Sequence, residues 1–361
     1  MTRVGSDIRF FGGSTMWGRG TDILENLHAQ GLEGVNIRTM YELSPTLDHG
    51  ELDDFRQAAL DLDMYVEMGV GKINPYMTAE LPAVRALGNG DYVAGMVRMI
   101  ETAAAMGWTT LWTACGGVKD FPVPYDTDRY RPEAPWSHQL RATTHLVSTL
   151  LPVLRDTGCT LAIETHEEIT SFELVRLVEE LGDPAVGICL DPGNLPARGE
   201  LPDEGIMRVA PHVVSTQLRD VVLFPAENGV VRYLSPVGEG LVDWTRTPAV
   251  LLRHRPDLNL TIEAMGGSRG RMDVPFDDPL WLSGQPDFTA ADGAGLRHLA
   301  DQHLRRVRAG DAEPADELDC IDPDHRAAHD RFVARSARHL REVLASPEFR
   351  ADTTMPMEDE T

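Results

Sequence analysis

Short apolar segments alternate with longer segments of helical periodicity eight times along the first 265 residues of this chain. The apolar segments are nearly continuous rather than alternating, which is typical of parallel strands buried on both faces. Many helical segments end at a glycine, the residue preferred just after a helix C-terminus. The segments expected to form strands are IRFFGG (8–13), VNIRT (35–39), YVEMGVG (65–71), TTLWTACGG (109–117), TLAIETH (160–166), VGICLDPGN (186–194), VVSTQLRD (213–220) and LTIEAM (260–265).

Eight strand–helix repeats favour parallel strands that are joined by crossover helices and closed into a (β/α)8 TIM barrel. The competing fold, a doubly wound open sheet, usually carries a glycine-rich phosphate-binding turn after its first strand. Here the sequence FFGGSTMWGRG does not give the GxGxxG pattern. We therefore expect a single TIM-barrel domain over residues 1–350, with the barrel itself in residues 1–265.

The pattern changes after the eighth expected strand. Residues 266–294 are rich in glycine, proline and aspartate, and a loop of this length in a compact domain usually has a function. Its large aromatic residues are Phe276, Trp281 and Phe288. We expect this segment to form a lid over the barrel mouth. Helices are expected in the C-terminal region 295–346, at 295–308 and 324–346, and residues 351–361 form an acidic tail.

Composition excludes several kinds of partner. The net charge is -24, from 33 basic and 57 acidic residues, so the surface repels nucleic acid and anionic membranes. No apolar run approaches the roughly 18 residues that span a bilayer, and the first residues lack a signal-peptide core. The cysteines form no CxxC pair, which favours free thiols. We expect a cytoplasmic protein without a nucleic-acid or membrane partner.

Four of the expected strands end in polar residues with oxygen atoms: Glu164, Asp191, Gln217 and Glu263. In a barrel, the carboxyl ends of the strands meet at one rim, where active sites lie. Buried carboxylates at one rim repel each other unless a cation lies between them. A single strand-end acid can instead cap a helix or pair with arginine, but the set favours a divalent metal. Because all donors are oxygens, we expect Mn²⁺ or Mg²⁺.

Other polar residues at this rim are candidates for catalysis and substrate binding. His166 lies two residues after Glu164, on the same side of an extended strand, and is the candidate general base or an additional ligand. The alternative for His166 is a hydrogen bond to the following EEIT segment. Lys72, Asn194 and Arg219 are candidate substrate contacts. Lys72 can instead be a solvated loop residue, and Arg219 can simply pair with Asp220.

The stretch IETHEEITSFELVRLVEELGDPAVGICLDPGN, followed by APHVVSTQLRD, PVGEGLVDW and LTIEA, resembles the xylose isomerase-like barrels called sugar phosphate isomerases/epimerases. The resemblance implies one metal ion held by Glu164, Asp191, Glu263 and the residue at position 217. The family usually has histidine at that position, in an HxHLKD segment, where this chain has Gln217. Glutamine can still coordinate through its oxygen, with weaker affinity.

Within this superfamily, the Glu-x-His pattern, the chain length and the long loop after the eighth strand resemble the larger subunit of the C-glycoside deglycosidases. That resemblance implies a carbon–carbon lyase acting on a 3-oxo-C-glycoside, with a smaller β subunit as partner in a higher oligomer. His166 would remove the proton next to the carbonyl, and the aglycone would then leave. The aromatic residues of the expected lid would suit a flat aglycone. The first alternative is a sugar isomerase or ketose 3-epimerase with Glu164 and Glu263 as its acid–base pair. Remote alternatives are an abasic-site endonuclease, which needs His-rich zinc ligands and a basic face, and a non-catalytic binding protein.

Overall fold

The computed structural model describes residues 2–8, 10–11, 14–15, 18, 20–116, 124–264 and 268–349. Eight parallel strands form its central sheet in the order β12-β1-β4-β5-β6-β7-β8-β9. These strands are β1 (Val4–Ile8), β4 (Gly34–Ile37), β5 (Tyr65–Gly69), β6 (Thr110–Thr113), β7 (Thr160–Glu164), β8 (Val186–Leu190), β9 (Val213–Thr216) and β12 (Leu260–Ile262). A parallel bridge between Leu218 and Ile262 joins the two edges of this sheet. The predicted (β/α)8 barrel is therefore confirmed.

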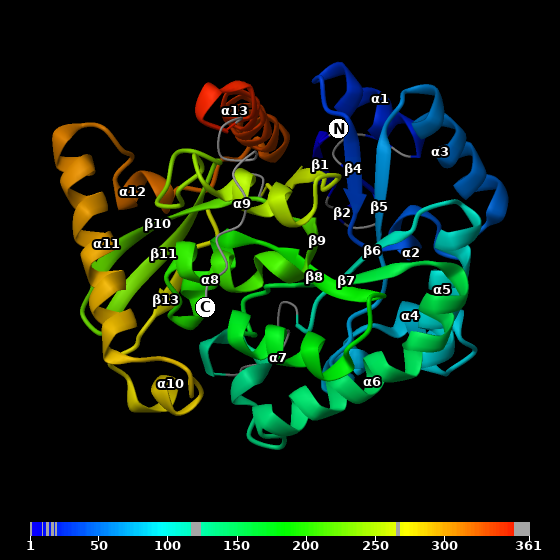
Figure 1. Cartoon of the computed structure of the whole chain (residues 1–361), viewed down its shortest axis with the longest axis horizontal. Helices are drawn as coiled ribbons and strands as arrows, with labels where there is room; N and C mark the ends of the chain where they lie inside the picture. The colour runs from blue at the N-terminus through cyan, green and yellow to red at the C-terminus, as the bar shows by residue number, and fades with distance from the viewer. Residues whose placement is uncertain are drawn as a thin grey trace.

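Helices surround the barrel between successive strands (Figure 1). The α-helices of the barrel are α1 (Thr21–Ala29), α2 (Met40–Leu43), α3 (His49–Asp61), α4 (Pro82–Leu87), α5 (Tyr92–Ala105), α6 (Trp136–Thr157), α7 (Ser171–Leu181), α8 (Pro202–Val209) and α9 (Thr247–His254). Short 3-10 helices are η1 (Pro75–Glu80), η2 (Pro124–Asp126), η3 (Asp128–Tyr130), η4 (Pro192–Arg198) and η5 (Ala210–His212). Helix α7 illustrates the local signals: Thr170 and Glu173 form a capping box, and Gly182 ends the helix with φ of 57°. These signals set the first and last residues of α7, the helix that follows β7.

The first strand lies earlier than the apolar run predicts. β1 covers Val4–Ile8, whereas the expectation was residues 8–13, and Phe10–Phe11 (β2) pairs instead with Ser14–Thr15 (β3). β1 contains Ser6 and Asp7, which are fully buried in the described structure. Polar groups fill part of this barrel's interior. A strand that carries them cannot be recognised from a run of apolar residues alone.

A three-stranded antiparallel sheet outside the barrel was not predicted. It consists of β10 (Asp220–Ala226), β11 (Gly229–Ser235) and β13 (Met272–Val274), and helix α11 (Ala290–Ala309) packs along it (Figure 1). After the turn between β10 and β11, β11 begins at Gly229, whose φ of 151° favours glycine. The hairpin begins directly after the segment that carries Gln217, so the chain leaves the barrel just after the carboxyl end of β9.

The described part of the expected lid, residues 268–294, contains β13 and the short helix α10 (Pro279–Ser283). Trp281 is fully buried and Phe276 is 5% exposed. The ring of Phe288 lies 5.5 Å from that of Trp281 and 5.6 Å from that of Phe276, between ring centroids. These rings form a packed cluster, so the expectation that they offer a surface to a flat aglycone is wrong. Large aromatic residues in a polar segment were interpreted as a binding surface, although they serve as its small core.

The C-terminal helices agree with the sequence. The expected segments 295–308 and 324–346 correspond to α11 and α13 (His325–Ala345), with the short α12 (Ala315–Leu318) between them. Cys115, Cys159 and Cys189 are buried free thiols, and Cys320 is an exposed one. Among the described residues, no helix is long and apolar enough to span a membrane. The expected acidic tail, residues 351–361, lies outside the described residues, and the single-domain boundaries stay a prediction.

Candidate active site and metal site

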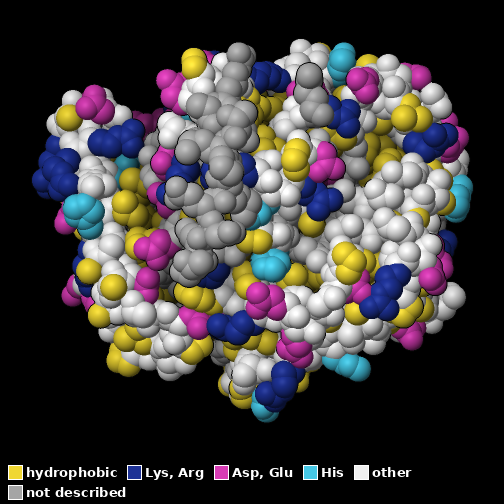
Figure 2. All heavy atoms as spheres, viewed as in Figure 1, with side chains coloured by type: hydrophobic (Ala, Val, Ile, Leu, Met, Phe, Trp, Pro, Cys, Tyr) yellow, Lys and Arg dark blue, Asp and Glu magenta, His cyan; other side chains and the backbone are white. Residues whose placement is uncertain are grey.

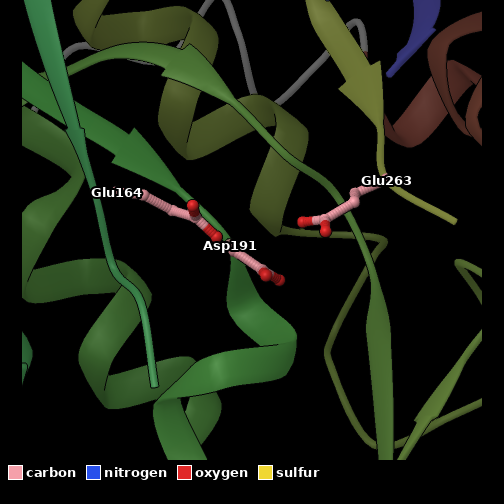
Figure 3. A group of neighbouring side chains, drawn as sticks. All are labelled: Glu164, Asp191 and Glu263. Atoms are coloured by element: carbon pink, nitrogen blue, oxygen red, sulfur yellow. The ribbon is translucent and has the colours of Figure 1, made fainter. Parts of the chain in front are cut away.

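Three buried carboxylates meet at the carboxyl end of the barrel (Figure 3). Glu164 is the last residue of β7, Asp191 follows β8, and Glu263 follows β12. Ligand atoms from the three lie within 4.8 Å of one another, and each residue is at most 1% exposed. The three carboxylates that the sequence singled out by their positions at strand ends therefore lie close together.

Gln217, the fourth expected ligand, follows β9 at the same end of the barrel. It is 1% exposed, and within the described structure neither its amide oxygen nor its amide nitrogen has a hydrogen-bond partner. Oε2 of Glu164 also has no partner there. A buried polar group without a partner costs about 1–3 kcal/mol, so an additional ligand at this position would be stabilising. Three carboxylates with an unpartnered amide oxygen fit a hard divalent cation.

Arg219 and Asn194 link the three carboxylates to one another. The Arg219 guanidinium donates to Asp191 and to Oδ1 of Asn194, and lies 3.2 Å from Oε2 of Glu263. Asn194 donates to Oε1 of Glu164 at 3.2 Å. Burial raises the pKa of Asp191, and Glu263 and Glu164 add to this, while Arg219 opposes it. Both predicted substrate contacts therefore lie in the site.

Arg219 does not pair with its neighbour Asp220, which was the alternative considered from the sequence. Asp220 accepts hydrogen bonds from the backbone of Gly240, Leu241 and Val242 and from the indole of Trp244. It thereby holds the loop after β11 against the start of β10. This leaves the Arg219 side chain to the carboxylates at the barrel mouth.

His166 is held by a residue that the sequence argument did not single out. Its Nδ1 lies 2.5 Å from Oε2 of Glu168, a buried carboxylate in the EEIT segment. Burial works to lower the pKa of His166, but Glu168 and Glu164 outweigh it and raise the pKa to about 9. A Cβ on Gly116 would lie 2.5 Å from the Glu168 carboxyl carbon, so glycine leaves room for this pair. The hydrogen bond considered as the alternative role of His166 is present, and the catalytic role stays a prediction.

Two cations lie over the ring of Trp112 at the same rim. The Lys72 ammonium is 4.3 Å and the Arg38 guanidinium carbon 5.0 Å from the ring centroid. Arg38 also donates to Oε1 of Glu263 at 3.0 Å. Burial, helped by Arg38, lowers the pKa of Lys72 to about 8. The Lys72 side chain is half-buried, and its role as a substrate contact stays a prediction. Arg38 was missed, although it lies near the end of the second expected strand, where rim residues are found.

The family model described as "Xylose isomerase-like TIM barrel" matches residues 24–280. Among curated proteins, 3-oxo-isoapionate decarboxylase of Pectobacterium atrosepticum is 26% identical over 227 residues, which is 62% of this chain and 70% of that protein. On the face in Figure 2, basic side chains are interspersed with acidic ones, unlike the basic face of an endonuclease.

Solved structures with the same fold include D-psicose 3-epimerase from Clostridium cellulolyticum H10, with a TM-score of 0.60. It is 11% identical, and the match covers 96% of this chain and 100% of that one. The 3-keto-D-glucoside 4-epimerase YcjR from Escherichia coli gives a TM-score of 0.53 at 13% identity, covering 82% of this chain and 100% of that one. At these identities the likeness concerns the fold alone.

Proposed function

Because the chain belongs to the xylose isomerase-like TIM barrel family, we propose that it is a divalent-metal-dependent carbon–carbon lyase acting on a 3-oxo sugar derivative. The observation that carries this proposal is the convergence of Glu164, Asp191 and Glu263 beside the unpartnered amide of Gln217. The 26% identical relative, 3-oxo-isoapionate decarboxylase, also acts on a 3-oxo compound, as its name states. Family membership makes the chain a sugar-processing enzyme, and the lyase reaction is our proposal.

Glu164, Asp191, Gln217 and Glu263 would hold the metal ion, with Mn²⁺ or Mg²⁺ favoured by oxygen donors. A divalent ion held there would polarise a carbonyl oxygen of the substrate and would offset the negative charge that develops on it. Asn194 and Arg219 lie against the same carboxylates and would hydrogen-bond to substrate oxygens.

In the reaction we favour, the substrate is a 3-oxo-C-glycoside. His166, in its unprotonated form, takes the proton from C2, which the adjacent carbonyl makes acidic, and Glu168 keeps the imidazole ring oriented through Nδ1. Because the pKa of His166 is raised to about 9, this step should be faster at alkaline pH. The electron pair of the C2–H bond forms an enolate with the 3-oxo group, and the electron pair of that enolate then forms a double bond between C1 and C2 as the bond from C1 to the aglycone breaks. The aglycone carbon keeps the electron pair of that bond and takes up a proton, which His166 can return or Glu263 can supply. A smaller β subunit would complete the enzyme.

A second candidate is decarboxylation of a 3-oxo sugar acid, which the 26% identical relative favours through its printed name. Here the bond to the carboxylate breaks, its electron pair forms an enolate with the 3-oxo group, and the carbon then takes up a proton. This reaction needs no aglycone pocket, which suits the burial of Trp281. Both lyase reactions require an enolate beside the same triad.

The test is an assay of the Mn²⁺-loaded chain, alone and with any small subunit recovered with it from the source cell. Three substrates are compared: a 3-oxo-C-glycoside for aglycone release, a 3-oxo sugar acid for CO2 release, and free ketoses for interconversion. Ketose interconversion without bond cleavage would refute the lyase and support an epimerase with Glu164 and Glu263 as its acid–base pair. His166→Ala should keep the metal and lose cleavage, whereas His138→Ala, on the exposed face of α6, should keep both.

A further inference from the structure

The cations Lys72 and Arg38 are positioned by two neighbouring strands. Arg38 directly follows β4, and Lys72 follows β5 by three residues, while β4 and β5 pair in parallel. Both charges lie over the ring of Trp112, a β6 residue that is 2% exposed. The barrel therefore places two positive groups over one buried aromatic ring at its mouth.

Lys72 has no anionic partner among the described residues. Within the part of the chain that the structure describes, its ammonium makes no hydrogen bond and no ion pair, and its one close polar contact is the ring of Trp112. The carboxylates that act on it at longer range also contact other residues: Glu168 contacts His166, and Glu164 accepts a hydrogen bond from Asn194. A half-buried ammonium beside a second cation is repelled by it, and a bound anion would relieve this repulsion.

Arg38 connects this pair to the carboxylate triad. Its Nη1 donates to Oε1 of Glu263 at 3.0 Å. A group bound between Lys72 and Arg38 therefore lies beside the carboxylates that would serve the reacting carbonyl. An anion held there belongs to the same small molecule as that carbonyl, rather than to a separate ligand.

We propose that Lys72 and Arg38, lying over Trp112, form a binding site for a carboxylate group of the substrate. The substrate class is then a 3-oxo sugar derivative that also carries an acid group. This inference rests on the proposed function, because it places the acid group and the reacting carbonyl in one barrel mouth. The net charge of the chain is -24 and repels anions at long range, so a preference for a carboxylate must come from these local cations.

The direct test is calorimetric titration of the EDTA-treated full chain with D-erythronate and with erythritol, a pair that differs in the carboxylate. Removing the metal prevents the probe from binding to it. The wild-type chain should bind erythronate at least about tenfold more tightly than erythritol, as expected for one charged hydrogen bond. Lys72→Met should abolish this preference, whereas Arg305→Met, which removes one positive charge from the exposed side of α11, should leave it unchanged.

Methionine is apolar and packs well beside an aromatic ring, so Lys72→Met should fold, and its melting temperature checks this. Equal binding of the two probes, no measurable erythronate binding, or a preference that survives in Lys72→Met would overturn the proposal. The Mn²⁺-loaded chain separates the two hypotheses. For each protein, kcat/KM is measured for a 3-oxo substrate with an acid group and for one without it, and the ratio of the two values is taken. If both substrates are cleaved and this ratio is the same in wild type and Lys72→Met, the carboxylate site is refuted and the lyase is kept. Loss of the erythronate preference in the variant, without cleavage of any 3-oxo substrate, would refute the lyase and keep the site.

Discussion

Glu67 should make the stability of this barrel depend on pH near neutrality. It lies on β5 inside the barrel, is 3% exposed, and accepts hydrogen bonds from Ser215 at 3.0 Å and Thr261 at 3.3 Å. Within the described structure it has no cationic partner. Burial raises the pKa of Glu67 from 4.5 to about 7, and the hydrogen bonds offset this only in part.

The sign and size of the effect follow from this pKa. Between pH 4.5 and 7 the folded chain keeps a proton on Glu67 that the unfolded chain has released. Raising the pH through this window therefore favours unfolding, and the full difference is on the order of 3 kcal/mol. Between pH 5 and pH 8 the wild-type chain should lose about 2–3 kcal/mol relative to a variant with no ionisable group at this position.

The assay is urea unfolding of the EDTA-treated wild type and of Glu67→Gln at pH 5, 6.5 and 8. Glutamine keeps the size and hydrogen-bonding capacity of the protonated acid, so the two proteins should be similar at pH 5 and diverge above it. Glu101→Gln, on the exposed side of α5, is the control for removing a carboxylate and should show a constant difference from wild type. A constant difference for Glu67→Gln as well would mean that Glu67 is ionised in the folded chain, and the argument from burial would be refuted.

The remaining predictions concern the site and its surroundings. Glu164→Gln and Asp191→Asn should each abolish Mn²⁺ binding and activity together, which calorimetry and the cleavage assay check; retained binding would remove these residues from the ligand set. Trp281→Ala should lower the free energy of unfolding by about 3–5 kcal/mol without raising KM, because the ring is fully buried; a raised KM in a stable variant would restore its role in substrate binding. Gly116→Ala should displace Glu168 and reduce kcat while Mn²⁺ still binds, so unchanged kcat would show that the Glu168–His166 pair is not needed.

The sequence was informative where one physical rule decided the outcome. Parallel strands of a barrel end at one rim, so Glu164, Asp191 and Glu263 could be placed together without any knowledge of the loops. Asn194 and Arg219 followed from the same rule, and both lie in the site. The repeated alternation of strands and helices predicted the barrel because each repeat carries the same pattern.

The sequence was less informative where the same residues are compatible with two different structural roles. β1 was placed too late because Ser6 and Asp7 lie inside the barrel, and polar residues lower the apolar signal of a strand. The hairpin β10–β11 was missed because its first residues continue an expected strand. Trp281 was assigned to a binding surface, since a polar segment gives no indication of its own small core. Glu168 lies only two residues after His166 and was included in the EEIT segment, but the sequence does not show which of its residues contacts the imidazole. Arg38 lies near a strand end, but its contact with Glu263 joins segments distant in sequence, which no local pattern specifies.

Arg219 changes the argument from which the metal was first inferred. Repulsion among three buried carboxylates predicted a cation, and the structure supplies one from the chain itself: the guanidinium lies against Asp191 and Glu263. Repulsion alone therefore no longer requires a metal. Two groups still favour a further ligand, because Arg219 does not contact them and they have no partner in the described structure. They are Oε2 of Glu164 and the amide of Gln217. The unsatisfied oxygen atoms, rather than the charge of the carboxylates, therefore favour a metal at this site, because Arg219 already compensates part of that charge.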